Sequence, residues 1–377
     1  MINKKLYQQI DAVAHRYYQW YESSVDHDSL DKWQERVWAN TKLIFQDDGH
    51  VNWQALVNFR RPCVFIPDMH PNSEFGDFDF VTWARALIKE PIAATARMGK
   101  EWVSGSGRGG RRHVLEAYDS LVNDGCLNLI EKYPTRGSPG NPYYLTHKGS
   151  TFNLRWLRHL YFVNLLQRHL DDAIRVQPDF TALDLGCGYG VFTYLLKSEY
   201  QKSRHIMIEF PEHLILCYYF LLRTFPDAKF LVVLTPSDVE AFDPATVDNY
   251  DFVLIPPECY QKLKGVKVNL YTNFISLGEM TREHFDGYLN HPVFQTCDGF
   301  FICNRVESQP RLEPTHQTDF TILDYPLADF ERLFFGVSIP HLYYYKRRHL
   351  FFYEKTPFSS QTFDFIGKRK DVLSKRV

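Results

Sequence analysis

The sequence lacks three features that would each define a class of protein. It has no run of about 18 apolar residues, so we expect no membrane-spanning helix. Its 7 cysteines are scattered and never form a C-x-x-C pair, which excludes the usual zinc and redox motifs and indicates free thiols. Neither sign of charge predominates, since 43 lysines and arginines stand against 45 aspartates and glutamates. A dedicated nucleic-acid-binding protein usually has a strongly basic face, so we expect no nucleic-acid partner.

A secretion signal is also not expected, because no apolar stretch follows the two lysines near the start. Together with free thiols, this predicts a cytoplasmic location. The 377 residues, 45% of them hydrophobic and 23% charged, are typical of a globular protein with one large domain or two.

The pattern of the chain changes near residue 150. Apolar residues at helical spacing predict amphipathic helices in 1–60. Segment 104–112 is rich in glycine and predicts no regular element, because glycine has a large backbone-entropy cost. We therefore predict a largely helical N-terminal region at 1–150, which forms an acceptor-binding wall or lid, and a second domain at 151–377.

After residue 178 the chain alternates between strand-like and helix-like segments. This alternation predicts an α/β fold with a Rossmann-like, doubly wound and mainly parallel sheet. An antiparallel strand pair is expected near the C-terminus. The predicted strands of the sheet are 181–185, 205–209, 229–234, 251–255, 266–271 and 299–304, and the predicted C-terminal pair is 341–345 with 350–353.

A glycine-rich turn follows the first predicted strand of the sheet. Asp184 lies on that strand, and glycines follow at positions 186, 188 and 190. Such a turn brings backbone N–H groups close to a ligand where a side chain would clash. A dinucleotide fingerprint would place glycine at position 191, where the sequence has Val191.

An acidic residue, Glu209, ends the next predicted strand, where a carboxylate can accept both ribose hydroxyls of an adenosine. Together with the Asp-x-Gly-x-Gly-x-Gly segment, it resembles the signature of class I S-adenosylmethionine-dependent methyltransferases. The resemblance implies S-adenosylmethionine as cofactor and Asp184 near its cationic amino-acid end. The implied cofactor contacts are Asp184, Gly186, Cys187, Gly188, Gly190 and Glu209.

Two longer segments, 209–221 and 271–280, resemble blocks of the sugar O-methyltransferase family. The Gly-Asn-Pro element at 140–142 is also similar to one in that family. The resemblance covers roughly 140–305 and implies a sugar hydroxyl as methyl acceptor, either free or linked to a nucleotide or polymer. It implies Asn141 as a substrate contact. Asn273 follows the strand at 266–271, at the edge where open α/β sheets bind ligands, and is predicted as a cofactor contact that orients the donor or the acceptor.

Methyl transfer to a hydroxyl needs a base for the hydroxyl proton, or a metal ion that lowers the hydroxyl pKa. Glu279 follows the strand at 266–271, on the edge where open α/β sheets bind ligands, and is our first candidate base. Its alternative role is to help start the next helix. His159 is the second candidate, although a lone histidine on a helix is more often structural.

Arg108 and Arg111, in the glycine-rich segment, can clamp the diphosphate of a nucleotide-linked sugar, since arginine forks suit phosphate oxygens. A solvated loop is the alternative. The acidic residues and histidine of 68–79 match no metal-ligand spacing, so no metal site is predicted.

Several alternatives stay open. Two strand-like segments separate Glu209 from Asn273, so the adenine contact is either Asp238 or the segment 256–258. An amino-methylating enzyme is disfavoured because the position of its usual N/D-P-P-Y motif is here Thr-Asn-Phe-Ile at 272–275. A non-catalytic, methyltransferase-like scaffold and an enzyme acting on a non-sugar small molecule are the remaining alternatives, and the oligomeric state stays open.

Overall fold

A computed structural model describes the main part of the chain as two compact units. One unit comprises Met1–Leu56, Leu165–Ser338 and Ser360–Val377, and the other comprises Val57–Asn164 and Ile339–Ser359. The described residues are 4–24, 42, 44–60, 106–142, 144–170, 179–309, 318–341, 343–349, 352–357 and 361–370. Because the first unit includes 1–56, the units do not coincide with the predicted division at residue 150.

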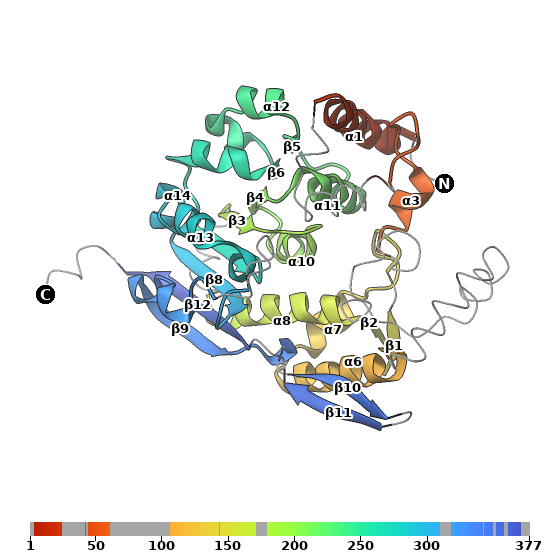
Figure 1. Cartoon of the computed structure of the whole chain (residues 1–377), viewed down its shortest axis with the longest axis vertical. Helices are drawn as coiled ribbons and strands as arrows, with labels where there is room; N and C mark the ends of the chain where they lie inside the picture. Colours follow the sequence, from red (N-terminus) through yellow and green to blue (C-terminus); the bar gives the residue numbers. More distant parts are fainter. Residues whose placement is uncertain are drawn as a thin grey trace, which may run out of the picture. The chain divides into compact units, whose positions relative to one another are not determined.

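An eight-stranded sheet organises the first unit (Figure 1). Its order is β5-β6-β4-β3-β7-β8-β12-β9, and β12 runs antiparallel to both of its neighbours while the other pairs are parallel. The predicted α/β fold with a mainly parallel sheet is thus confirmed. The strands are β3 (Thr181–Leu185), β4 (Arg204–Ile208), β5 (Phe230–Val232), β6 (Phe252–Ile255), β7 (Leu270–Phe274), β8 (Gly299–Arg305), β9 (Phe330–Val337) and β12 (Thr362–Arg369).

Helices connect these strands, and several of those between residues 244 and 295 share a hydrophobic cluster with them. That cluster includes Leu183 of β3, Ile206 of β4 and Tyr271 of β7, all fully buried. The longest connecting helix, α11, begins at Pro211 as predicted, since proline at the first helical position gives up no hydrogen bond. The connecting elements are α10 (Val191–Glu199), α11 (Pro211–Thr224), α12 (Pro236–Ala241), η3 (Pro244–Asn249), η4 (Pro257–Leu263), η5 (Leu277–Glu279), α13 (Arg282–Leu289), α14 (Pro292–Gln295), η6 (Ile322–Asp324) and η7 (Leu327–Asp329).

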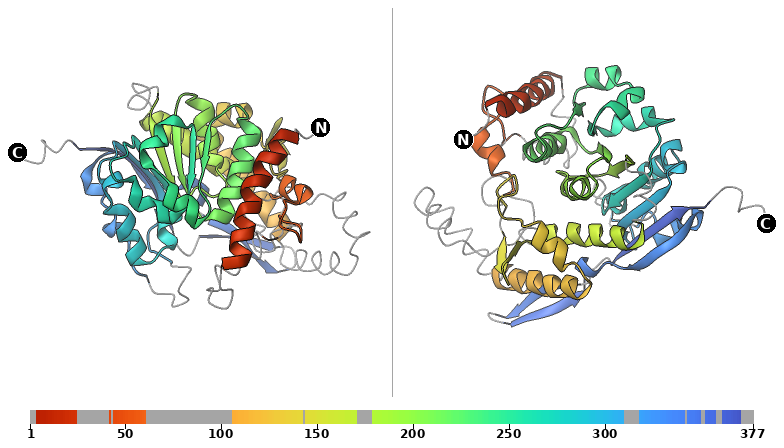
Figure 2. Two further views of the ribbon diagram at one scale, coloured as in Figure 1. Left: turned by 90° about the horizontal axis from the view of Figure 1, so that it is seen from above. Right: turned by 180° about the vertical axis from the view of Figure 1, so that it is seen from behind.

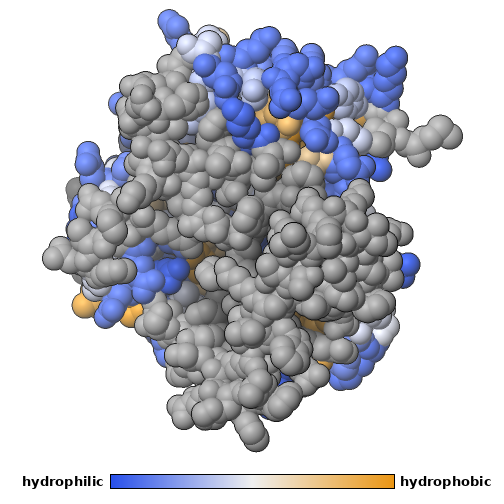
Figure 3. Space-filling view, turned by 45° about the vertical axis from the view of Figure 1, so that its right-hand side comes forward, coloured by the Kyte–Doolittle hydropathy of each residue, from blue (hydrophilic) through white to orange (hydrophobic). Residues whose placement is uncertain are grey.

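Two N-terminal helices, α1 (Lys4–Ser24) and α3 (Trp53–Val57), confirm the prediction of helices in 1–60 for their own residues. The residues of α1 that are buried recur every three or four positions, and α1 packs against α11 in the same unit (Figures 1 and 2). They are Leu6, Ile10, Ala14, Tyr17 and Tyr21. On the face drawn in Figure 3, hydrophilic residues predominate among the described ones.

The second unit is mainly helical and contains two small antiparallel sheets. The strand β10 packs against α6. The helix α8 (Leu154–His169) passes from this unit into the first. The other elements are α6 (Ser106–Asn123), α7 (Leu127–Lys132), β1 (Leu145–His147), β2 (Ser150–Phe152), η8 (Ile339–His341), β10 (Tyr343–His349) and β11 (Phe352–Pro357).

The prediction of an irregular glycine-rich segment at 104–112 was wrong for its described part, because α6 begins at Ser106. The later residues of α6 supply the reason. Val114, Tyr118 and Leu121 form a buried face, and this packing outweighs a cost of about 1 kcal/mol for each glycine in the helix.

The C-terminal strands also differ from the prediction. The expected antiparallel pair exists as β10 and β11, but its basic segment 346–349 lies inside β10 and the pair forms its own sheet in the second unit. The C-terminal antiparallel strand of the main sheet is instead β12, between β8 and β9. Phe363, Phe365 and Ile366 bury β12 on both faces, so the sequence shows no alternation there.

Among the described residues, no helix combines the length and the apolar character needed to cross a lipid bilayer.

Candidate functional site

The order of the strands locates the site of the first unit. The chain runs from β3 to β4 on one side and later adds β7 on the other side of β3. In open α/β sheets, ligands bind beyond the carboxyl ends of the strands where the order reverses in this way. The glycine turn at 186–190 directly follows β3, so it lies at this position.

The glycine turn is packed at its two ends and open in the middle. All three glycines have positive φ values of 74°, 56° and 85°. A Cβ atom on Gly186 would lie 2.1 Å from Ser276 Oγ, and one on Gly190 would lie 2.9 Å from Cys217 Sγ. A Cβ atom on Gly188 would meet nothing within 4 Å. The open space therefore lies at Gly188, where a ligand can approach the backbone.

Glu209 holds the turn against the end of β4. Its carboxylate accepts hydrogen bonds from the N–H groups of Gly188 at 2.9 Å and Phe210 at 3.0 Å, and lies 3.5 Å from His213 Nδ1. Burial by itself raises the pKa of Glu209, but His213 and the two N–H groups together lower it below its ordinary value. The carboxylate is therefore ionised at neutral pH.

Asp184 lies at the end of β3, just before this turn. Its Oδ1 accepts a hydrogen bond from Thr272 Oγ1 of β7 at 2.9 Å. Burial is the main cause that raises the pKa of Asp184 to about 7, and the charge of Glu209 adds to it, while the hydrogen bond from Thr272 acts in the opposite direction. Asp184 therefore changes its charge near neutral pH.

Asn273 is fully buried and uses its amide within the protein. Its Nδ2 donates to the carbonyl of Leu185 at 2.6 Å and to Ser276 Oγ at 2.5 Å. Its Oδ1 accepts from Leu277 N at 3.0 Å and Asn304 Nδ2 at 2.7 Å. This arrangement ties the ends of β3, β7 and β8 together. The geometry gives Asn273 a positioning role within the protein, and its contact with the cofactor stays a prediction.

Glu279 lies in η5, after β7, and forms an ion pair with Arg305, the last residue of β8. Its Oε1 lies 3.2 Å from Arg305 Nη2, and the two side chains are 19% and 21% exposed. An acceptor hydroxyl would have to compete with this guanidinium for the carboxylate. Glu279 lies in the first turn of η5, whereas the acidic residue in the first turn of α13 is Glu283.

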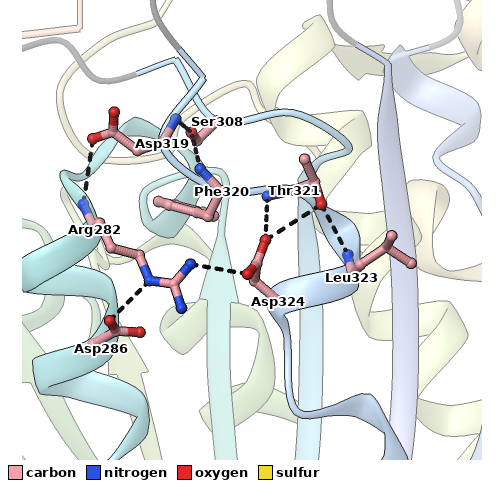
Figure 4. A network of polar contacts seen from close by, with 8 residues as sticks. All are labelled: Arg282, Asp286, Ser308, Asp319, Phe320, Thr321, Leu323 and Asp324. Carbon is pink, nitrogen blue, oxygen red and sulfur yellow. Dashed lines mark hydrogen bonds and ion pairs between the residues drawn. The ribbon is translucent and has the colours of Figure 1, made fainter.

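A polar network instead fixes the start of α13 (Figure 4). Arg282 reaches Asp286 in its own helix at 2.8 Å and Asp324 of η6 at 2.9 Å. The side chain of Asp324 also accepts from the backbone N–H of Thr321 at 2.8 Å. This network of partly exposed side chains holds η6 against α13 and contains none of the predicted site residues.

The remaining predicted residues belong to the second unit. His159 lies on α8, and its Nδ1 is 2.7 Å from the carbonyl oxygen of Arg155, a contact in which the ring nitrogen donates. Burial, with the charge of Arg158, holds the pKa of His159 well below its ordinary value. Asn141 has a φ of 49° and donates to Asn58 at 2.7 Å, as expected of an asparagine in a turn.

Arg108 and Arg111 are part of α6, and their side chains are outside the described residues. The predicted sites thus divide between the two units. Asp184, Glu209, the glycine turn, Asn273 and Glu279 gather at one edge of the main sheet, whereas His159, Asn141 and the arginines lie elsewhere in the chain. The acidic segment 68–79 is outside the described part, within which no group of three acidic, histidine or cysteine side chains is placed to hold a metal ion.

Comparison with known proteins gives similarities to solved structures alone. Neither the protein-family models nor the curated proteins include a match to the chain. TehB from Haemophilus influenzae has 12% identity over 55% of this chain and 67% of its own, with a TM-score of 0.32. Human N-acetylserotonin methyltransferase in complex with SAM has 13% identity over 56% of each chain, with a TM-score of 0.28. For magnesium protoporphyrin IX methyltransferase from Synechocystis PCC 6803 with bound SAH, the identity is 11% over 55% of this chain and 87% of its own, and the TM-score is 0.31.

Three residues at this edge were not predicted. Asn304 joins the network of Asn273, and Arg305 pairs with Glu279. Ile275 has a φ of 75°, a strained conformation for a β-branched residue, and its N–H donates to the carbonyl of Cys303 at 2.7 Å. A polar pair at the end of the apolar strand 299–304 was the available signal for Asn304 and Arg305. No sequence pattern predicts the backbone of Ile275.

Proposed function

We propose that the first unit binds S-adenosylmethionine and that the protein transfers a methyl group from it to a hydroxyl of a sugar or glycoconjugate. One observation carries this proposal: an ionised Glu209 holds a glycine turn that is open at Gly188, at the point where the strand order reverses. The backbone approach and the carboxylate suit the adenosine part of such a cofactor.

The residues present fit the cofactor at both of its ends. Glu209 is held by two backbone N–H groups and can accept further hydrogen bonds from ribose hydroxyls, since a carboxylate has about four acceptor sites. Asp184 is beside the turn and, when ionised, attracts a cationic amino group directly or through water. When bound, S-adenosylmethionine supplies a methyl group on a positively charged sulfur.

The acceptor is proposed from the residues of 271–280 and their similarity to the sugar O-methyltransferase family. Glu279 would take the hydroxyl proton, exchanging its contact with Arg305 for one with the acceptor. The free thiols among the described cysteines support a cytoplasmic location for this reaction.

A non-catalytic, cofactor-binding scaffold is the second candidate, and the Glu279–Arg305 ion pair favours it. If this ion pair stays closed, Glu279 is not available as the base for an acceptor hydroxyl. An enzyme that methylates a non-sugar small molecule is the remaining alternative, and the test of acceptors distinguishes it from a sugar methyltransferase.

The test begins with calorimetric titration of S-adenosylhomocysteine into the full chain. We expect micromolar binding to wild type and a loss of at least about tenfold, or 1.4 kcal/mol, in Glu209→Ala. Glu283→Ala, which removes an exposed carboxylate from the first turn of α13, is the matched control and should bind like wild type. A folded wild type that does not bind would overturn the proposal.

Transfer of a labelled methyl group to a panel of sugars, nucleotide sugars and polysaccharides then separates the candidates. Labelled product supports the enzyme, and its absence in a protein that binds S-adenosylhomocysteine supports the scaffold. If only non-sugar hydroxyl compounds are labelled, the protein is an enzyme whose acceptor is not a sugar.

A further inference from the structure

Helix α1 reaches the cofactor-side edge of the sheet through two polar contacts. The hydroxyl of Tyr17 donates to Glu212 Oε1 at 2.8 Å, and these residues are 1% and 9% exposed. One residue earlier, Arg16 Nη2 lies 3.1 Å from Asp238 Oδ2 at the start of α12. These contacts join residues far apart in the sequence, and α1 lies beside α11 in each view (Figures 1 and 2).

Glu212 belongs to the same turn of α11 that follows Glu209. Its neighbour His213 lies against the Glu209 carboxylate, so any shift of this turn moves the group that holds Gly188. The pKa of Tyr17 is raised mainly by burial, then by Glu212, and the negative charge of Glu258, which follows β6, adds to it. Tyr17 therefore lies at the first turn of α11, which follows the carboxyl end of β4, on the side of the sheet where the ribose is expected.

We propose that α1 forms a wall of the cofactor site and that Tyr17 is a positioning residue, which holds the first turn of α11 through Glu212 so that Glu209 faces the glycine turn. The inference rests on the proposed function. It assigns the N-terminal helix to the cofactor, whereas the sequence placed 1–150 with the acceptor.

The hydrogen bond from Tyr17 affects the charge of the Glu212 carboxyl group. Burial is the main cause that raises the pKa of Glu212, and the charge of Glu209 adds to it, while the backbone of α11, the Tyr17 hydroxyl and His213 lower it. Tyr21 of α1 is also close enough for the charge of Glu212 to raise the pKa of its hydroxyl, after burial as the main cause. Without the Tyr17 hydroxyl, Glu212 should take up its proton at a higher pH.

The experiment compares two Tyr→Phe variants on the same helix. Tyr17→Phe removes the hydrogen bond to Glu212, and Tyr7→Phe removes one at 3.3 Å to the carbonyl of Val51. The affinity of the full chain for S-adenosylhomocysteine is measured by calorimetry from about pH 6 to 9, and the unfolding midpoint of each variant is recorded. Asp184 titrates in this range in all three proteins, so only the difference from wild type counts.

Tyr17→Phe should weaken binding about tenfold. As the pH is lowered, the affinity of this variant should begin to fall at a higher pH than the affinity of wild type does. Tyr7→Phe should bind within about twofold of wild type at every pH. Arg16→Ala, an exposed change in the same contact region, should weaken binding about threefold without unfolding the protein.

Equal affinities and equal pH profiles for the two phenylalanine variants would overturn the role of Tyr17 while leaving the proposed cofactor in place. If Tyr17→Phe does not fold, the result for Arg16→Ala decides. Wild-type affinity in Arg16→Ala would overturn the proposal that α1 forms a wall of the cofactor site. A folded wild type that fails to bind would overturn both the cofactor and this inference.

Discussion

At the scale of single residues, the same glycine-to-alanine substitution should have different effects on stability at two positions of the glycine turn. Gly186→Ala places a methyl group 2.1 Å from Ser276 Oγ, whereas Gly188→Ala meets nothing within 4 Å, and both residues have positive φ. We expect Gly188→Ala to lower the free energy of unfolding by about 1 kcal/mol and Gly186→Ala by about 3 kcal/mol. Urea denaturation measures both changes.

The same pair also tests where the ligand approaches. Despite its small effect on stability, Gly188→Ala should weaken S-adenosylhomocysteine binding at least about tenfold, because its methyl group fills the open part of the turn. Normal binding by a folded Gly188→Ala variant would show that no ligand contacts this backbone.

Asp184 gives the molecule a stability that depends on pH. Its pKa rises from 3.8 to about 7 on folding, so the folded state binds more protons between these values and the free energy of unfolding falls as pH rises. Asp184→Asn has no buried carboxyl group to ionise as the pH rises, and it keeps an oxygen that accepts the hydrogen bond from Thr272. Relative to wild type, it should therefore gain about 3 kcal/mol between pH 5 and pH 8.

Urea denaturation at the two pH values checks this expectation. Asp286→Asn, on the exposed side of α13, is the control and should not show the gain. A constant difference between Asp184→Asn and wild type would mean that the carboxyl group titrates alike in the folded and unfolded chains.

At the scale of elements, the ends of three strands depend on one amide. Asn273 makes hydrogen bonds toward β3 and β8 from the end of its own strand, and Asn273→Ala leaves several buried partners unsatisfied. We expect a loss of about 3 kcal/mol in the free energy of unfolding, with S-adenosylhomocysteine affinity within about threefold of wild type. Asn290→Ala, at the exposed end of α13, should change neither value.

The opposite result would support the cofactor contact that the sequence predicts for Asn273. A stable Asn273→Ala variant that binds S-adenosylhomocysteine more than about tenfold less tightly would make Asn273 a direct contact. Denaturation and calorimetry on the same samples distinguish the two roles.

Elements were predicted best where the pattern is local. The strand at 181–185 and the start of α11 follow from apolar residues and a proline that need no distant partner. β12 and the start of α6 could not be predicted, since their conformations depend on neighbours supplied by other parts of the chain.

At the scale of the whole molecule, charge balance predicts weak interaction with polyanions. The chain has a net charge of -2, so few counterions would be released on contact with nucleic acid. We expect no retention on heparin at about 0.15 M salt and no loss of S-adenosylhomocysteine affinity when RNA is added. Retention on heparin at this salt concentration would indicate a locally basic surface that the net charge of the chain does not reveal.

The candidate site was predicted in part. Residues that are neighbours in sequence, such as Asp184 and the glycines, were identified together, and Glu209 followed because it ends the next strand. Arg305, which pairs with Glu279, was missed because the two residues come from different strands and meet only when β7 and β8 lie side by side.

The sequence by itself determined the class of fold, the position of the glycine turn and the acidic residues near it, because short-range periodicity and glycine spacing act within a few residues. The tertiary structure alone decided that α1 packs on α11, that Asn273 ties strand ends together and that Asp184 has a pKa of about 7. Each of these depends on burial and on partners from distant segments, and no local pattern specifies which segments will meet.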